Sequence, residues 1–247
     1  EIQNEQITGA INSAVSEASQ RGGTARVEIR AEVPENSSTV EIIIPQDTVR
    51  TANDNALDAI VFSTSVVEIA FDRDTLTAIA QEAAENIRIT ASRADAERLS
   101  EEARQVVGDR PVYEFSVTSG DKVISRFGGY VTVSVPYTPK PDEDVNAIVI
   151  YYINAEGKPE IVRDCVYDPA AGTVRFSTNH FSRYAVGHNK VRFNDVAESA
   201  WYSKAVSFIA ARGITQGTGN GNFSPGAKIT RGQFIVMLMK AYGLEPD

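Results

Sequence analysis

The 247-residue chain carries 24 Lys and Arg residues and 33 Asp and Glu residues, a formal net charge of −9 at neutral pH. At roughly 100–200 residues per domain, this length accommodates one large domain or two to three small ones. The 42% of hydrophobic and 23% of charged residues are typical of a globular protein, which excludes a disordered chain and a coiled coil. The apolar runs are far shorter than the ~20 residues of a membrane-spanning helix, so we predict no membrane insertion.

Charge is unevenly distributed along the chain. Residues 190–247 hold seven basic and four acidic side chains, a net charge of +3, whereas residues 1–189 hold 17 basic and 29 acidic ones, a net charge of −12. An acidic body repels nucleic acid and anionic lipid, so neither is an expected partner, while the basic tail suits an anionic one. The chain opens without the basic and apolar stretches of a secretory leader, and we expect any leader to have been removed.

The residues that commonly carry catalysis or bind metals form no recognisable pattern. The single cysteine, Cys165, has no disulfide partner, and its spacing from His180 and His188 matches no zinc site, so no metal or cofactor is expected. A Cys–His nucleophile needs an adjacent pair and an orienting third group, which this spacing does not indicate. No pair of carboxylates is singled out for glycoside hydrolysis, and Gly128-Gly129 fits no phosphate-binding motif. The sequence therefore predicts no catalytic residues and a protein that is not an enzyme.

Residues 1–110 mix helical and strand patterns. Apolar side chains at three- and four-residue spacing predict a helix over residues 1–20. Strict alternation over Ala25–Val33 predicts a strand with one solvent-exposed face. The same criteria predict strands over Val40–Ile44, Leu57–Phe62, Val66–Phe71 and Ile87–Ser92, and a helix over Asp95–Val107.

A weak internal repeat with an offset of 27 residues lies within this region. Val40-Glu41-Ile42 matches Val67-Glu68-Ile69, and Asp47-Thr48-Val49 matches Asp74-Thr75-Leu76. Each copy predicts a strand, a turn and a short helix opened by an Asp or Thr cap. A duplication and two independent but similar strand–helix connections both explain the repeat.

From Val112 onward the pattern is almost wholly β. Strands are predicted over Val112–Thr118, Lys122–Ser125, Tyr130–Pro136, Ala147–Asn154, Pro159–Arg163, Thr173–Ser177 and Ser182–Val186. No strict alternation of strands and helices occurs, which favours an α+β fold over a parallel α/β fold. We predict an α+β body with helices early and sheet later, as two domains over residues 1–110 and 111–189 or as one.

In residues 190–247 the pattern changes and predicts two helices with clear start and stop signals. We therefore predict a small all-α domain there. The first helix is expected over Ala200–Arg212, capped by Ser199 and ended by a glycine. Thr230 and Gln233 form the capping-box pattern that opens the second helix. We expect this domain to pack lightly on the body, because a tethered module gains from being an independent unit.

Short motifs in this tail follow one another in the order and spacing of a known family. They are Phe193-Asn194-Asp195-Val196, Trp201-Tyr202, Gly213-Ile214, Gly217, Gly221-Asn222-Phe223-Ser224-Pro225 and Ile229-Thr230-Arg231. Residues 191–244 therefore resemble one S-layer homology (SLH) domain. The family's usual Thr-Arg-Ala-Glu is here Thr230-Arg231-Gly232-Gln233, in which Gln closes the capping box without a charge and Gly costs about 1 kcal/mol of helix propensity relative to Ala.

The resemblance implies an exported, Gram-positive cell-surface protein, located extracellularly at the cell wall or S-layer. Its expected ligand is secondary cell-wall polysaccharide, commonly pyruvylated and bound non-covalently. SLH repeats normally occur in threes with grooves between neighbours, so neighbouring repeats of a parent chain are expected partners. One repeat by itself is expected to bind weakly or not at all.

The candidate polysaccharide contacts are Asp195, Trp201, Thr230 and Arg231. Arg231 lies in the first turn of a helix, where the macrodipole disfavours a cation by up to ~1 kcal/mol but free N–H groups attract an anion such as a pyruvate carboxylate. Trp201 offers a flat face for a sugar ring. Purely structural roles are the alternative: Asp195 starts a turn, Thr230 caps its helix, and Trp201 belongs to the core.

The body resembles, less closely, a module found upstream of SLH repeats in Gram-positive surface proteins, particularly over residues 111–186. The predicted function is therefore non-catalytic anchoring at the cell surface. The alternative is a carbohydrate-binding module or a carbohydrate-active enzyme in residues 1–189, with the SLH unit as its tether. An apolar cleft with close carboxylates favours the enzyme. A flat aromatic strip favours the binding module, and its candidate members are Tyr113, Tyr137, Tyr151 and Tyr152.

Overall fold

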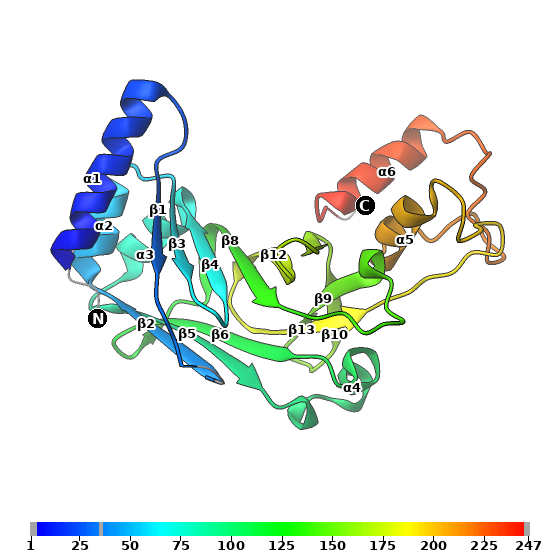
Figure 1. The fold of residues 1–247 in the computed structure, drawn as a ribbon, viewed down its shortest axis with the longest axis horizontal. Helices are drawn as coiled ribbons and strands as arrows, with labels where there is room; N and C mark the ends of the chain where they lie inside the picture. The colour runs from blue at the N-terminus through cyan, green and yellow to red at the C-terminus, as the bar shows by residue number, and fades with distance from the viewer. Residues whose placement is uncertain (1–3, 35–36, 245–247) are drawn as a thin grey trace. The chain divides into compact units, whose positions relative to one another are not determined.

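The computed structural model describes residues 4–34 and 37–244, which form an α+β fold with six α-helices and two β-sheets (Figure 1). The chain divides into two compact units. Unit 1 contains the described residues of Glu1–Ala94, Tyr113–Pro136 and Ser177–Arg183. Unit 2 contains those of Asp95–Val112, Tyr137–Phe176 and Tyr184–Asp247. The predicted fold class of the body is confirmed.

Unit 1 holds most of the early helices and strands. Its elements are α1 (Asn4–Arg21), β1 (Arg26–Arg30), β2 (Thr39–Ile44), α2 (Gln46–Asp54), β3 (Ala59–Ser63), β4 (Glu68–Asp72), α3 (Arg73–Glu82), β5 (Ile87–Ala94), nearly all of β6 (Val112–Ser119), β7 (Lys122–Val123) and β8 (Arg126–Pro136). Strand β1 runs parallel to β3, and β3, β4 and β8 follow as antiparallel neighbours. Strand β2 pairs antiparallel with β5, and β6 with β7.

Most elements predicted for residues 1–110 are present, with differences at their ends. Residues 1–3 of the first predicted helix lie outside the described residues. The helix predicted over Asp95–Val107 is instead a 3₁₀ turn, η1 (Ala96–Arg98), followed by α4 (Glu101–Val107). Helix α4 begins there because the Ser100 hydroxyl accepts a hydrogen bond from the Ala103 N–H.

Gly129 of strand β8 has a structural explanation. The Asp72 carboxylate caps α3 by accepting the Thr75 N–H at 2.8 Å, and it also accepts the Tyr130 N–H at 2.7 Å. A Cβ atom at Gly129 would lie 2.2 Å from an Asp72 oxygen, so a side chain there would displace the cap. Helix α2 begins after Pro45 with no such side-chain cap. The two strand–helix connections of the weak repeat therefore differ in how their helices are capped.

Unit 2 contains the later strands and the C-terminal helices. Its elements are η1, α4, η2 (Val145–Ala147), β9 (Ile148–Ile153), β10 (Pro159–Val162), β11 (Cys165–Asp168), the first half of β12 (Thr173–His180), most of β13 (Arg183–His188), α5 (Ser203–Ala211) and α6 (Arg231–Ala241). Strand β9 lies between β10 and β13, and β11 pairs antiparallel with β12.

The two helices predicted for the C-terminal segment, residues 190–247, are present as α5 and α6, but the segment is only partly helical among its described residues. Helix α5 begins at Ser203 without a side-chain cap, not after Ser199 as predicted. Between the two helices lies a long irregular segment with several residues at positive φ, which no helix tolerates. These residues are Gly213, Gly217, Gly219, Asn220, Gly221 and Ser224.

A buried arginine fixes helix α5 within unit 2. The Arg212 side chain follows the last turn of α5 and is only 1% exposed. Its guanidinium donates to the backbone oxygens of Cys165 at 2.9 Å, Asn146 at 3.0 Å and Ile148 at 3.1 Å. Burial lowers the pKa of Arg212 from its usual value, but no carboxylate is among its hydrogen-bond partners. Backbone carbonyl dipoles therefore stabilise the buried charge.

Further contacts dock the first half of the C-terminal segment. The Ser207 hydroxyl of α5 donates to the Asp144 carboxylate at 2.8 Å, and the Asn189 amide donates to the Ala211 oxygen at 2.7 Å. We expected light packing, but α5 is tied to residues 144–148 by buried polar contacts. The domain limits at residues 110 and 189 stay predictions.

Replacement of Arg212 by alanine tests this tie. Arg212→Ala removes the charge and leaves three carbonyls, two in residues 146–148 and one at Cys165, without this donor. We expect a loss of about 3 kcal/mol or more in the free energy of unfolding, measured by urea denaturation. The exposed Arg104 of α4 is the matched control, and Arg104→Ala should change the free energy by less than about 0.5 kcal/mol. Equal effects of the two substitutions would contradict a special role for Arg212.

Candidate functional site

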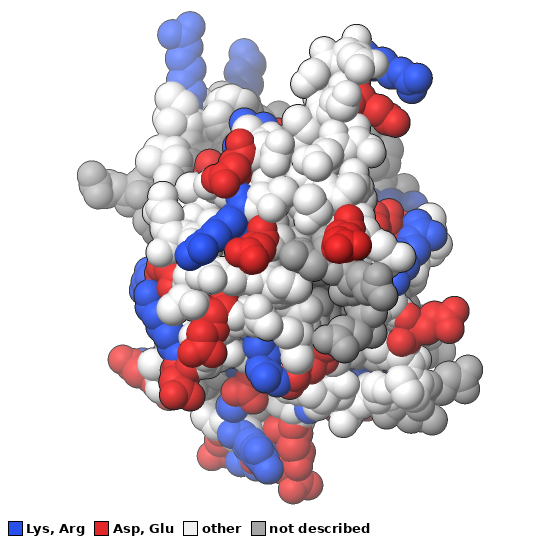
Figure 2. Space-filling model, turned by 90° about the vertical axis from the view of Figure 1, so that its left-hand side faces the viewer, with Lys and Arg blue, Asp and Glu red and all other residues white. Residues whose placement is uncertain are grey.

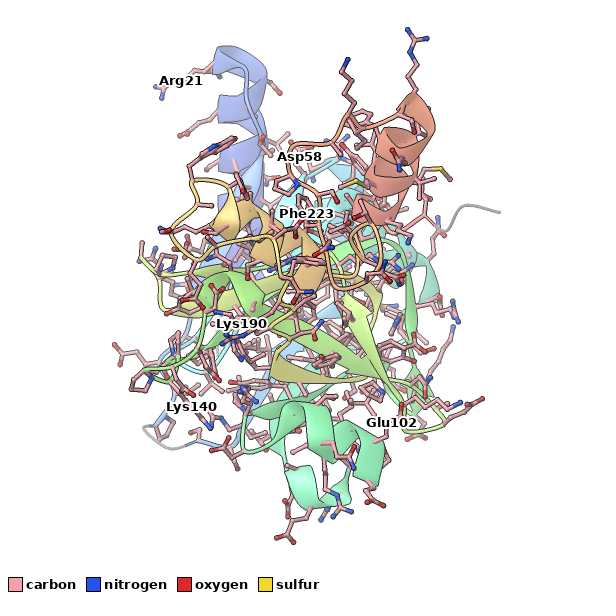
Figure 3. The ribbon with its side chains drawn as sticks, turned by 90° about the vertical axis from the view of Figure 1, so that its right-hand side faces the viewer. Arg21, Asp58, Glu102, Lys140, Lys190 and Phe223 are labelled. Carbon is pink, nitrogen blue, oxygen red and sulfur yellow. The ribbon has the colours of Figure 1, made fainter. Side chains whose placement is uncertain are left out.

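Asp195 joins the two halves of the C-terminal motif. One carboxylate oxygen accepts the Phe223 N–H at 2.8 Å, and the other accepts the Ser224 N–H at 2.7 Å. These two backbone donors, that of Phe223 first, lower the pKa of Asp195 from its ordinary value. Asp195 therefore holds the loop near Phe223, which Figure 3 labels, against the start of the segment. The structural alternative for Asp195 was that it only starts a turn. Its carboxylate also holds a distant loop.

The motif glycines allow a close approach of the same loop. A Cβ atom at Gly217 would lie 2.3 Å from the Asn222 oxygen and 2.6 Å from the Phe193 ring, and its φ is +77°. A Cβ atom at Gly221 would lie 2.8 Å from the Asn194 amide nitrogen. The rings of Phe193 and Phe223 pack with their centroids 5.5 Å apart. These residues form a small core with Val206 of α5, so the glycines are needed for packing.

Trp201 is the most exposed large apolar side chain in the described residues. It is 93% exposed, and its ring contacts Tyr202 edge-on at a centroid distance of 5.5 Å. It lies in the turn before α5. The core alternative for Trp201 is therefore wrong, and a flat apolar face is open to solvent.

Thr230 and Arg231 open helix α6 in different ways. The Thr230 hydroxyl accepts the Gln233 N–H at 3.2 Å, and the Gln233 side chain accepts the Thr230 N–H at 2.9 Å. The predicted capping box is thereby confirmed, and it occupies the Thr230 side chain. Arg231 is exposed in the first turn and has no ion pair within the described ranges 4–34 and 37–244.

Helix α6 buries none of its residues in the described part of the chain. Apolar side chains are nevertheless frequent in and around it. Those that are exposed are Ile229, Phe234, Ile235, Val236, Leu238, Tyr242 and Leu244. Monomeric proteins rarely leave so many apolar side chains of one element in solvent, so α6 has the character of an interaction surface.

Outside the motif, a network of charged groups surrounds the loop between β8 and β9. Arg110 donates to one Glu143 oxygen through Nε at 2.8 Å and Nη2 at 2.5 Å. The Tyr137 hydroxyl donates to the other oxygen at 2.5 Å. Burial raises the pKa of Glu143, but these hydrogen bonds outweigh it and hold the pKa below its ordinary value. Burial, and then the bond to Glu143, raises the pKa of Tyr137 well above its ordinary value.

Asp144 and His188 extend this network toward α5. Asp144 accepts from the Asn146 N–H at 3.0 Å as well as from Ser207, so its pKa stays low despite burial. The backbone N–H of Asp144 donates to the His188 Nε2 at 3.1 Å, which requires an unprotonated Nε2. Burial lowers the pKa of His188 from its ordinary value. Sequence reasoning missed this network because its members are far apart along the chain.

The aromatic strip considered for sugar binding does not exist as a surface. Tyr113, Tyr137 and Tyr151 are buried, and Tyr152 is half-buried against Tyr184. Among the described residues, no group of three His, Cys, Asp or Glu side chains is placed to hold a metal ion. Acidic and basic side chains are intermixed on the face shown in Figure 2, without a continuous patch of one sign. No helix in the described residues has the length and apolarity needed to cross a membrane.

Two comparisons with known proteins bear on the motif. The family model described as the S-layer homology domain matches residues 192–235, a range that contains all four predicted site residues. An amylopullulanase of Thermoanaerobacterium thermosulfurigenes is 27% identical to this chain over 132 residues. That alignment covers 51% of this chain but only 7% of the relative. The chain thus spans a small fraction of the length of the curated relative it matches.

Removal of the Asp195 carboxylate tests its structural role. Asp195→Ala should accelerate hydrogen exchange at the Phe223 and Ser224 amides, because both lose their acceptor. The exposed Asp121 is the matched control, and Asp121→Ala should leave these amides unchanged. Unchanged exchange at both amides in Asp195→Ala would show that the loop is held by other contacts.

His188 predicts a pH dependence of stability. Its folded-state pKa is lowered, so the unfolded chain binds more protons as the pH falls below the ordinary value of 6.5. The wild-type melting temperature should therefore fall between about pH 6.5 and pH 5. His188→Gln keeps an acceptor for the Asp144 N–H but does not titrate, so its fall should be smaller. Identical slopes in the wild type and in His188→Gln would contradict the assignment.

Proposed function

Residues 192–235 match an S-layer homology domain, and from this premise we propose that the chain is a non-catalytic cell-surface protein anchored non-covalently to secondary cell-wall polysaccharide. S-layer homology domains generally bind cell-wall polysaccharides, so the match indicates association with the cell surface. The observation that carries the finer proposal is an exposed Arg231 at the start of α6 that forms no ion pair with the described residues.

Arg231 is better explained by binding than by folding. A cation in the first turn interacts unfavourably with the helix dipole, and neighbouring Thr230 and Gln233 already cap the helix. An arginine matches the planar geometry of a carboxylate through paired N–H donors. A pyruvate ketal on a wall sugar supplies such a carboxylate, so a pyruvylated polymer is the ligand we propose.

Trp201 is proposed as the stacking platform for a sugar ring. Trp201 is 93% exposed despite its edge-on contact with Tyr202, so most of its aromatic surface is open to a sugar ring. Asp195 and Thr230 remain in the proposed site, but their side chains are engaged in holding the loop and capping the helix. Their part is to position Arg231 and the loop.

Neighbouring SLH repeats of a longer chain are the proposed partners of α6. Its exposed apolar side chains need a cover, and a repeat of similar composition provides one. If each repeat supplies one wall, two neighbouring repeats together form a groove with two walls.

Two carboxylates of unit 2, Glu143 and Asp144, are poorly suited to the acid catalysis of a glycosidase. A glycosidase needs one carboxylic acid with a raised pKa to protonate the leaving group. Glu143 and Asp144 instead have lowered pKa values and fully engaged oxygens.

The alternative is an enzyme or a carbohydrate-binding module in residues 1–189, with the SLH unit as its tether. The similarity to an amylopullulanase favours this alternative. Incubation of the full chain with pullulan or starch separates the two. Release of reducing sugar would favour the enzyme, and retention on the insoluble glucan without release would favour the binding module.

Binding to native cell-wall sacculi tests Arg231 directly. Loss of a charge-assisted contact should weaken association of Arg231→Gln with sacculi roughly 10- to 150-fold in co-sedimentation. The melting temperature should stay unchanged or rise slightly, because the charge opposes the helix dipole. A chain carrying the complete set of repeats is the protein to use, since a single repeat lacks part of its groove.

Lys240, in the last turn of the same helix, provides the matched control. Lys240→Gln removes one positive charge where the dipole favours it, so it should leave sacculus binding near the wild-type level and slightly lower stability. Should Arg231→Gln lower the melting temperature sharply and bind sacculi normally, Arg231 is structural and the proposal fails.

A further inference from the structure

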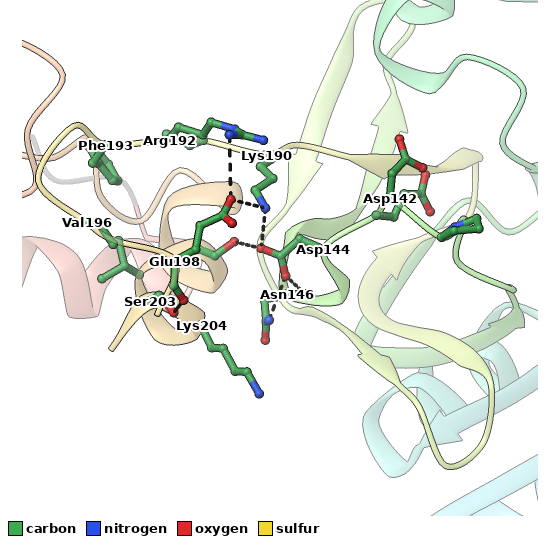
Figure 4. A pocket seen from close by; sticks show the side chains of 15 residues that line it. Asp142, Asp144, Asn146, Lys190, Arg192, Phe193, Val196, Glu198, Ser203 and Lys204 are labelled. Atoms are coloured by element: carbon green, nitrogen blue, oxygen red, sulfur yellow. Dashed lines mark hydrogen bonds and ion pairs between the residues drawn. The ribbon is translucent and has the colours of Figure 1, made fainter. Parts of the chain in front are cut away.

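A polar cavity of about 470 Å³ lies beside helix α5, within unit 2 (Figure 4). Its walls are the loop 141–146, the extended segment 190–198 and the first turn of α5. Both signs of charge line it. The lining side chains that matter below are Asp144, Lys190, Arg192 and Glu198.

Two cations in this cavity meet at one carboxylate oxygen. The Lys190 Nζ lies 4.0 Å from the Glu198 Oε1, and the Arg192 Nη1 lies 3.9 Å from the same atom. Figure 4 shows both contacts as dashed lines that end on Glu198. Both distances exceed those of a hydrogen bond, so these ion pairs are weak.

The two carboxylates near Lys190 differ in how firmly they are held. Asp144 is engaged by Ser207 and by Asn146, and its side chain is only 19% exposed. The Glu198 side chain is 81% exposed, and its carboxylate makes no hydrogen bond to the described residues. Glu198 is therefore free to swing away at little cost, whereas Asp144 is part of the fold.

We propose that this cavity binds one carboxylate of an acidic sugar unit, which takes the place of the Glu198 carboxylate between Lys190 and Arg192. The exchange replaces one negative charge by another, so the cavity keeps its charge balance. Arg192 is 77% exposed, which leaves its guanidinium open to a paired contact with the incoming carboxylate. The partly exposed apolar side chains of Val191 and Val196 line the same cavity, and they suit the C–H face of a sugar ring.

The inference deepens the proposed function, because it gives an acidic wall polysaccharide a second contact besides Arg231. The loop contributes two further acidic side chains to the lining, Asp142 and Glu143. Asp142 is exposed, so solvent screens its charge. The Glu143 side chain is only 2% exposed, and Arg110 neutralises its charge. Lys204, also in the lining, adds a third cation.

Trigalacturonic acid, which carries one carboxylate per sugar, is the probe, and its methyl ester is the uncharged reference. Binding to the full chain is measured by titration calorimetry in low salt. Lys190→Gln and Arg192→Gln should each weaken binding of the acid about tenfold. Glu198→Gln should strengthen it about two- to fivefold, because the competing carboxylate is gone. The methyl ester should bind weakly to all four proteins.

Glu102→Gln is the matched control for Glu198→Gln. Glu102 is an exposed acid at the start of α4, labelled in Figure 3, and its removal changes the net charge by the same amount. A gain in affinity with Glu198→Gln alone supports displacement in the cavity. An equal gain with Glu102→Gln would show a general charge effect and overturn the inference.

Sacculus binding of the same variants separates this inference from the proposed function. If Lys190→Gln and Arg192→Gln bind the acid as the wild type does, the cavity is not a carboxylate site. Weakened sacculus binding by Arg231→Gln in the same experiment would leave the proposed function intact. If none of the variants loses sacculus binding, the proposed function is wrong.

Discussion

The buried guanidinium of Arg212 is the interaction on which the C-terminal half of this protein depends. A charge in the interior is tolerated only when its donors are satisfied, and the acceptors here are the backbone oxygens of Asn146, Ile148 and Cys165, with that of Phe208 in α5 itself. Because these acceptors come from separate segments, the position of α5 is determined by the sheet-bearing part of unit 2. The Ser207–Asp144 contact and the cavity beside α5 follow from that position.

The two helices of the C-terminal segment, α5 and α6, differ in how far they are buried. Helix α5 buries Val206, Ala210 and Ala211, and its flanking residues form a small core with Phe193. In the described part of the chain, helix α6 has no buried residue and exposes most of its apolar side chains. Stability is thus concentrated where the segment meets the rest of unit 2, while the end that carries Arg231 remains open. This division is the one expected of an anchored binding unit whose ligand and partners come from outside.

Sequence periodicity predicted the local elements well and the long-range contacts poorly. Alternation located the strands of both units, and the Thr230–Gln233 pattern located the start of α6. The burial of Arg212 was not predictable, because a cation near a helix end is also what the helix dipole favours at the surface. The role of Asp195 depends on a loop 28 residues away, and the Tyr side chains gave no sign of which face is covered. The segment is only partly helical because residues with positive φ, most of them glycines, lie between its two helices.

The most direct test of the account compares wall material with and without its secondary polysaccharide. Native sacculi and sacculi stripped of that polymer by acid extraction are sedimented, at equal protein concentration, with a chain carrying the complete set of repeats. Anchoring through the polysaccharide predicts retention on the native material and loss of most of that retention after extraction. It also predicts that free extracted polymer releases the bound chain. Equal retention on both materials would contradict the account, since the chain would then bind peptidoglycan or adhere non-specifically.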